Sequence, residues 1–221
     1  MTTSMMVDEE LYRRYLGGSG WATVYYHQTG HLRLSPLAPQ SPLIFAAGLL
    51  TGTPVPTACK LSVCARSPLT GLWSESTVGG RFGAQLKAAG YDALIFVGRA
   101  ASPCYLWLQD DRVELRPADR VWGLDTYETD ELLRTETTKD AAVAAIGSAG
   151  ERLIRLASIM VGGREGRAAG RTGLGAAMGA KNLKAVVVRG HSRPAIKDRA
   201  ALLDMVRADN KEIVTSSSGL A

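Results

Sequence analysis

The stretch GAQLKAAGYDALIFVG at residues 83–98 returns in altered form as GAAMGAKNLKAVVVRG at residues 175–190. The two stretches lie 92 residues apart and are identical at five positions. Gly90 and Asn182 occupy the same place, and both residue types tolerate the left-handed conformation that ends many helices. Each copy therefore predicts a glycine-rich loop, a short helix, a left-handed cap and a buried strand. The duplication predicts two similar units related by a pseudo-twofold axis.

Glycine-rich loops precede both predicted helices, at residues 79–83 and 170–175. A helix N-terminus carries unpaired N–H groups and about half a positive charge, and glycines let a ligand approach it closely. The two copies therefore predict two phosphate-sized anion sites that face one another. Tight packing of a helix on a sheet is the alternative explanation for the same glycines, and one loop alone does not decide between the two.

Positive charge is concentrated in the second half of the chain. Residues 152–199 contain eleven Lys and Arg against two acids, a net charge of +9, whereas the whole chain is +5. In this segment the bases Arg164, Arg167 and Arg171 alternate with glycines, which favours an anion-binding surface. A nucleic-acid surface more often carries its bases on a helix or among stacking aromatics, and this segment has no Phe, Trp or Tyr. We therefore expect no nucleic-acid partner.

Composition places the chain among globular proteins. Its 221 residues are 46% hydrophobic and 21% charged, which allows a packed core. No apolar run reaches the roughly 20 residues that cross a bilayer, and the N-terminus lacks the pattern of a signal peptide, so no membrane partner is expected. An odd set of three cysteines favours a reducing, cytoplasmic setting.

The remaining sequence predicts an α+β fold with two packed β-sheets and short helices. Asp125 and Glu128 form a capping-box pattern that opens a helix to about residue 137. Asp110 and Asp111 separate two alternating segments, which predicts a hairpin. The other predictions are helices at 8–16 and from 198 towards 214, strands at 43–47, 61–65, 104–109, 112–116 and 141–146, a loop at 48–60, a turn at 67–71, and a strand at 151–160, where a helix fits equally well.

Common catalytic and metal-binding patterns are lacking. The glycine loops match neither a dinucleotide fingerprint nor a P-loop, and Ser148 does not lie in a nucleophile elbow. His27 and His31 fall in a region predicted to be a loop, and His191 lies far away along the chain. Cys59 and Cys64 alone cannot hold an iron–sulfur cluster, which needs about four thiolates. We therefore predict no catalytic residue and no protein metal ligand in this chain.

Several motifs together resemble the N-terminal domain of the tungsten-containing aldehyde ferredoxin oxidoreductases. The resemblance covers roughly residues 8–200. It is carried by AAGLLTGT at 46–53, SPLTG at 67–71, GGRFGAQLKAAGYDA at 79–93, IGSAGE at 146–151 and RAAGRTGLGAAMGAKNLKA at 167–185.

The resemblance implies a saddle of two β-sheets that carries a tungsten, or molybdenum, bis-pyranopterin whose phosphates are linked by Mg²⁺. In that family the enzyme oxidises an aldehyde to a carboxylate and passes electrons through a [4Fe-4S] cluster to ferredoxin. Lysine at 60 and threonine at 77 stand where the family usually has arginine and often asparagine. The cofactor-binding residues implied by position are Lys60, Thr77, Gly79, Gly80, Arg167, Ala168, Gly170, Arg171 and Gly173.

The resemblance also implies a division of the chain. Residues 1–197 correspond to the pyranopterin-binding domain, and residues 198–221 to a linker or the start of a helical domain. The large helical domains that carry the cluster and the aldehyde site in the family are absent from these 221 residues. We therefore expect the chain alone to be inactive and to need those domains or a partner subunit. A non-catalytic pterin- or anion-binding subunit that docks on a partner is the alternative.

Overall fold

The computed structural model describes residues 2–29 and 33–217. The helices are α1 (Glu9–Tyr15), α2 (Gly18–Gln28), α3 (Phe82–Ala88), α4 (Thr126–Glu136), α5 (Ser148–Glu151), the 3₁₀ turn η2 (Gly163–Glu165), α6 (Leu174–Gly179) and α7 (Arg199–Ser217). The strands are β1 (Leu43–Ala47), β2 (Leu61–Arg66), β3 (Trp73–Val78), β4 (Ala93–Phe96), β5 (Cys104–Gln109), β6 (Arg112–Pro117), β7 (Ala142–Ala145), β8 (Ile159–Val161), β9 (Arg167–Ala169) and β10 (Leu183–Arg189).

The strands form two sheets with the same internal order. The first sheet has the order β3-β2-β1-β4, and the second contains β9-β8-β7-β10 with β5 and β6 added beyond β10. All pairs inside the two four-stranded units are antiparallel. In each unit three strands follow one another, a short helix crosses over, and the last strand returns beside the first. The predicted repeat is confirmed, and it covers the whole four-stranded unit.

Strand register shows that the two units match residue by residue. Ala93 lies opposite Ala46 in the first unit, and Ala185, its counterpart in the repeat, lies opposite Ala145 in the second. The helix caps also correspond, because Gly90 has a φ of 89° and Asn182 a φ of 56°. Both residues are therefore in the left-handed conformation that their residue types predicted.

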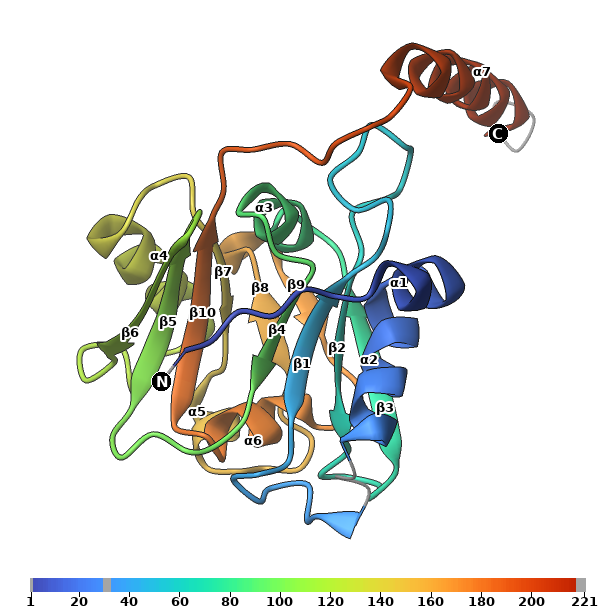
Figure 1. Cartoon of the computed structure of the whole chain (residues 1–221). Coiled ribbons are helices and arrows are strands. Elements are labelled where there is room, and N and C mark those ends of the chain that lie inside the picture. Colours follow the sequence, from blue (N-terminus) through green and yellow to red (C-terminus); the bar gives the residue numbers. More distant parts are fainter. Residues whose placement is uncertain (1, 30–32, 218–221) are drawn as a thin grey trace.

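The two sheets pack face to face with helices between and outside them (Figure 1). The central core combines residues of both sheets with residues of α3 and α6, among them Phe45, Leu86, Met178 and Val186. A second cluster joins α4 to the outer face of the second sheet, and a third joins α2 to the outer face of the first. The predicted α+β class with two packed sheets is confirmed.

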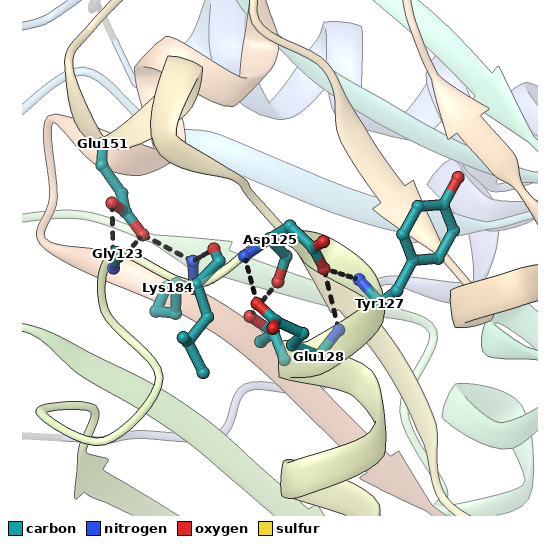
Figure 2. Close-up of polar contacts among 8 residues, drawn as sticks. Gly123, Asp125, Tyr127, Glu128, Glu151 and Lys184 are labelled. Atoms are coloured by element: carbon teal, nitrogen blue, oxygen red, sulfur yellow. Dashed lines mark hydrogen bonds and ion pairs between the residues drawn. The ribbon is translucent and has the colours of Figure 1, made fainter.

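A buried ion pair anchors the outer helix α4 and the short helix α5 to the second sheet (Figure 2). Lys184 of β10 is fully buried and pairs with Glu151 at the end of α5. Its amine also donates to the Leu124 carbonyl at 2.8 Å, and both Glu151 oxygens accept from the Gly123 N–H. The predicted capping box at Asp125 and Glu128 then opens α4.

Most predicted elements are confirmed, and the exceptions have local causes. Of the predicted strand 151–160, only the last two residues belong to a strand, because α5 and a turn occupy the residues before β8. Sequence analysis missed β3, β9 and α2. His27 lies in the last turn of α2 and not in a loop, whereas His31 lies outside the described residues.

Helix α7 stands apart from the sandwich at the end of an extended segment, residues 190–198 (Figure 1). Asp198 caps it by accepting from the Ala201 N–H at 2.9 Å. Within residues 2–29 and 33–217, no helix combines the length and the apolar character that a membrane crossing requires.

Candidate functional site

Strand β3 lies at one edge of the first sheet and β9 at one edge of the second, and the two strands run side by side. The Arg171 N–H, two residues beyond β9, donates to the Ser76 hydroxyl of β3 at 3.2 Å. At the other end of the contact, a Cβ atom placed on Gly80 would lie 3.6 Å from Cγ of Arg167. We call the exposed surface along β3, β9 and the residues that immediately follow them the seam.

The pseudo-twofold axis passes through the seam. The pairings of β1 and β7 with their neighbours make Leu61 equivalent to Ile159. Leu61 pairs with Val78 and Ile159 with Ala169, so each residue of β3 is equivalent to the residue of β9 that lies 91 positions later. Ser76 then corresponds to Arg167, and Gly80 to Arg171. The two approaches across the seam therefore involve equivalent pairs of positions, Ser76 with Arg171 and Arg167 with Gly80.

The structure brings eight of the nine predicted cofactor-binding residues to the seam. Lys60 directly precedes Leu61, whose partner is Val78, so it lies beside Gly79. Exposed side chains come from both edges of the seam. The eight residues are Lys60, Thr77, Gly79, Gly80, Arg167, Ala168, Gly170 and Arg171, of which Gly79 and Gly80 are half-buried and the others exposed.

Gly173, the ninth residue, does not lie on this surface. It is buried with a φ of 75°, and a Cβ atom there would come within 1.9 Å of the Arg155 carbonyl oxygen. Packing and backbone conformation therefore account for this glycine. We correct its predicted role as a cofactor contact to a structural one.

Two seam glycines have no such packing reason. A Cβ atom on Gly79 would meet only Cys59 Sγ, at 4.0 Å. On Gly170 its nearest neighbours would be Ala168 Cβ at 3.6 Å and Ser158 Oγ at 3.7 Å, which are ordinary contacts. Neither residue has a positive φ. Gly79 and Gly170 correspond in the repeat, so the chain leaves room for a side-chain methyl group at the same position on both sides of the axis.

The predicted pair of helix N-terminal anion sites is wrong. The first two residues of α3 and of α6 are buried. Gly175 donates its N–H to the Ala157 carbonyl at 2.9 Å, and a Cβ atom there would be 2.5 Å from the Ser158 oxygen. At Gly83, its counterpart, a Cβ atom would lie 3.0 Å from Cγ2 of Thr51 and 3.4 Å from Cβ of Leu61. These glycines allow the helices to pack against the backbone that enters β2 and β8, so the helix ends do not reach the seam surface.

Cationic side chains without partners supply positive charge at the seam. Within the described parts of the chain, the amine of Lys60 and the guanidinium groups of Arg167 and Arg171 make no hydrogen bond or ion pair. Two acids lie nearby: Glu165, whose Oε2 would lie 3.9 Å from a Cβ on Gly80, and the exposed Glu75 of β3. By contrast, Arg164 is held by Glu131 at 2.9 Å. The three unpaired cations can therefore meet an anion without first breaking a contact in the protein.

Thiols and metal ligands are sparse at the seam. Cys59 is exposed beside Gly79, whereas burial raises the pKa of the Cys64 thiol to about 12 and raises that of Cys104. No group of three or more His, Cys, Asp and Glu side chains able to hold a metal occurs among the residues that the structure describes. The three unpaired cations, and not a cluster of metal ligands, are therefore the chemical feature that distinguishes the described part of the seam.

The equivalence of Gly79 and Gly170 was missed by sequence analysis. The spacing of 92 residues that aligns the helices places Gly79 opposite Arg171, because the segment between β9 and α6 is one residue longer than that between β3 and α3. Allowing a single-residue gap before the helices would have aligned the glycines.

Comparison with known proteins gives a family match over most of the chain. The family model for the aldehyde ferredoxin oxidoreductase N-terminal domain matches residues 1–190. Tungsten-containing aldehyde ferredoxin oxidoreductases of Pyrococcus horikoshii and Thermococcus kodakarensis are 43% and 40% identical to this chain. Each match covers 90% of this chain and 33% of the relative. The chain thus spans about a third of the length of the curated relatives that it matches.

More distant relatives share the same region. The WOR-like subunit of an aliphatic sulfonate oxidoreductase from Pyrococcus furiosus is 32% identical over 96% of this chain and 36% of its own length. Among solved structures, the active-site complex BamBC of benzoyl coenzyme A reductase, with bound 1,5-dienoyl-CoA, matches with a TM-score of 0.88 and 38% identity. That match covers 92% of this chain and 31% of the other.

Proposed function

The chain belongs to the aldehyde ferredoxin oxidoreductase family, and we propose that its seam binds the phosphates and the pterin of a tungsten or molybdenum bis-pyranopterin. The observation that carries the proposal is the symmetric pair of open glycines, Gly79 and Gly170, beside three unpaired cations. A ligand with two similar halves matches a surface with two similar halves. The tungsten named in the relatives supports the metal, which supplies redox chemistry when bound.

The residues of the seam have separate parts in this proposal. Arg167 and Arg171 offer planar guanidinium groups that suit phosphate oxygens, and Lys60 offers a point charge. Gly79 and Gly170 let the ligand lie directly on the backbone, while Gly80, Thr77 and Ala168 border it. Mg²⁺ between the two phosphates would offset their mutual repulsion, so that three protein cations suffice.

Catalysis by the complete enzyme requires more than this chain. We propose that the [4Fe-4S] cluster, the aldehyde site and the ferredoxin contact lie in the two thirds of the relatives that this chain does not cover. The cofactor-loaded 221-residue protein should then fail to reduce viologen or ferredoxin with aldehyde. Detectable turnover would show that the chain contains a substrate site of its own.

A non-catalytic pterin- or anion-binding subunit remains the second candidate. It is favoured by two relatives described as parts of assemblies, the WOR-like subunit and the complex BamBC. A Cys-x-x-Cys-x-x-x-Cys segment in the reading frame downstream of residue 221 would favour the enzyme domain. Stable cofactor binding without such a segment would favour the subunit.

Cofactor binding at the seam can be tested by metal content and thiol protection. Protein purified without air should contain tungsten or molybdenum together with pterin fluorescence. The double variant Arg167→Ala and Arg171→Ala should lose most of both, because each charge-assisted hydrogen bond is worth about 1.5–3 kcal/mol. Arg112→Ala is the matched control, since that exposed arginine pairs with Glu114 on the distant hairpin β5–β6.

Cys59 provides a direct probe of the same surface. Iodoacetamide should modify the exposed Cys59 before Cys64 and Cys104, whose thiols have raised pKa values, because the thiolate is the reactive form. Bound cofactor should protect Cys59. Equal labelling of Cys59 with and without cofactor, or full cofactor content in the double arginine variant, would place the ligand elsewhere.

A further inference from the structure

One buried side chain ties together the two ends of the loop between β1 and β2, residues 48–60. Thr51 is 3% exposed. Its hydroxyl accepts from the Gly48 N–H at 3.1 Å and donates to the Lys60 carbonyl at 3.0 Å. Gly48 opens the loop and Lys60 closes it, directly before β2. Thr51 therefore fixes the backbone of Lys60, one of the three unpaired cations of the seam.

Packing against α3 holds the Thr51 hydroxyl in this orientation. A Cβ atom placed on Gly83, in the first turn of α3, would lie 3.0 Å from the Thr51 methyl carbon. Threonine is branched at Cβ, so few side-chain rotamers remain once that methyl group is packed. The side chain is therefore a stiff spacer between α3 and the residue that enters β2.

The second half of the fold makes the same crossing without a hydroxyl. Gly150 corresponds to Thr51, because the Thr51 N–H donates to the Gly48 carbonyl at 3.1 Å and the Gly150 N–H donates to the Gly147 carbonyl at 3.0 Å. A Cβ atom on Gly150 would lie 3.0 Å from the Gly175 carbonyl oxygen, so this segment packs directly on α6. The crossing itself therefore does not require a hydroxyl at this position.

The residues that end the two loops differ in charge. Strand register makes Lys60 equivalent to Ser158, which directly precedes β8. In the second half, the backbone at this point is held by α6, because the Gly175 N–H donates to the Ala157 carbonyl at 2.9 Å. The hydroxyl of Thr51 thus holds the loop end in the half of the fold where that end carries a cation.

We propose that Thr51 is a positioning residue whose hydroxyl holds the Lys60 backbone so that the amine meets a phosphate of the ligand, an inference that rests on the function proposed for the seam. Lysine offers a point charge on a flexible four-carbon stem, without the planar fork that directs an arginine. The backbone at the base of that stem is therefore the part of Lys60 that the protein can fix. Without the tie, Lys60 keeps its charge, but its amine samples a larger volume and holds the phosphate less firmly.

Release of the cofactor from the full chain tests the proposal. Protein that carries tungsten and pterin is purified without air, and pterin release is followed by fluorescence. Lys60→Ala should speed release about 10–100-fold, because a charge-assisted hydrogen bond is lost. Thr51→Val keeps the shape of the side chain but removes the hydroxyl, and should speed release about three- to tenfold. Thr51→Ser keeps the hydroxyl and should restore the wild-type rate.

A double-mutant cycle separates positioning from general support of the fold. If Thr51 acts through Lys60, Thr51→Val should have little further effect on release in the Lys60→Ala background. Thr129→Val is the matched control, because Thr129 is a fully buried threonine whose hydroxyl donates to the Asp125 carbonyl in α4, outside the loop and the seam. This control should lower the free energy of unfolding without changing release.

The possible failures are distinguishable. If Lys60→Ala leaves release unchanged, or the wild type holds no cofactor, the function proposed for the seam fails and this inference fails with it. If Lys60→Ala speeds release and Thr51→Val does not, or if the two effects add in full, Thr51 is not a positioning residue and the proposed function stands. Amide exchange checks the tie without cofactor: the Gly48 amide should exchange slowly in the wild type and in Thr51→Ser. Fast exchange at Gly48 in the wild type would overturn the proposal even if Thr51→Val fails to fold.

Discussion

At the scale of single residues, the glycines of the repeat fall into two classes that can be separated by substitution. Gly79→Ala and Gly170→Ala should leave the free energy of unfolding within about 1 kcal/mol of wild type or raise it, because there is room for the methyl group and the unfolded chain becomes stiffer. Gly175→Ala should destabilise by several kcal/mol, since its Cβ would lie 2.5 Å from the Ser158 oxygen. Urea unfolding measures all three.

The two variants expected to be stable, Gly79→Ala and Gly170→Ala, should nevertheless be impaired in cofactor binding. Gly79→Ala and Gly170→Ala should fold normally yet lose bound metal, because the added methyl group would occupy the space directly above the backbone where the proposed ligand lies. Full metal retention in both variants would remove the main support for the proposed site.

This distinction explains how far the sequence could predict the site. Through the family resemblance, sequence analysis selected eight residues that the structure brings to the seam, and their role in cofactor binding stays a prediction. It could not tell a glycine required by packing, such as Gly173, from one that leaves open space, such as Gly79. That difference depends on the Arg155 carbonyl and on Cys59, which are distant in sequence from the glycines they face.

Lys181 makes stability depend on pH in a defined direction. Burial lowers its pKa to about 8, and its amine donates to the carbonyls of Pro39 at 3.0 Å and Ser41 at 2.7 Å. Between pH 8 and the unfolded-state pKa near 10.5, the unfolded chain binds more protons than the folded protein. The free energy of unfolding that this residue contributes therefore rises with pH across that window.

Lys181→Met removes this pH dependence. Between pH 7.5 and 9.5 the stability of the wild type, relative to the variant, should increase by about 2 kcal/mol. Urea unfolding of both proteins in a reducing buffer measures the difference, in which the titration of cysteines and tyrosines cancels. A constant or falling difference would contradict the lowered pKa.

At the scale of elements, the Lys184–Glu151 pair fixes α5 and the start of α4 on the second sheet (Figure 2). Lys184→Met should cost about 3–5 kcal/mol, because Glu151 is left buried without its cation. The double variant Lys184→Met and Glu151→Leu should recover much of that loss, since no charge remains to be solvated. A double-mutant cycle from urea unfolding measures the coupling, and additive losses would show that the two side chains act separately.

Elements with strong local signals were predictable, and those defined by tertiary partners were not. The capping box at Asp125 and the Asp110 turn were enough to predict α4 and the β5–β6 hairpin. Strand β9 has three residues and β3 carries a Ser-Glu-Ser-Thr run, so neither has a pronounced apolar pattern. Helix α2 begins at Gly18, with Gly17 directly before it and Gly20 inside it, and glycine is a poor helix former. These three elements form because the sheets and the outer face of β1 offer them partners.

At the scale of the whole molecule, the shared core makes the two repeats one cooperative unit, from which α7 stands apart. The central cluster takes residues from both sheets, whereas Val206 is the one residue of α7, up to Ser216, that is buried. The segment before α7 is attached more firmly. Gly190 donates its N–H to Gln85 at 2.9 Å, and Ser192 donates its N–H to Ala88 at 3.0 Å. The boundary of the folded unit should therefore lie after this segment and before α7.

Two truncations test that boundary. A chain that ends at Lys197 should unfold at the same urea concentration as the full chain, with a slightly smaller dependence on denaturant, because it loses a helix that buries little surface. A chain that ends at Arg189 should be clearly less stable, since Gln85 and Ala88 lose their partners and Gly190 no longer packs on α3. If removal of residues 198–221 lowers the midpoint as much as removal of residues 190–221, then α7 contributes to the fold, and the predicted domain limit at residue 197 is wrong.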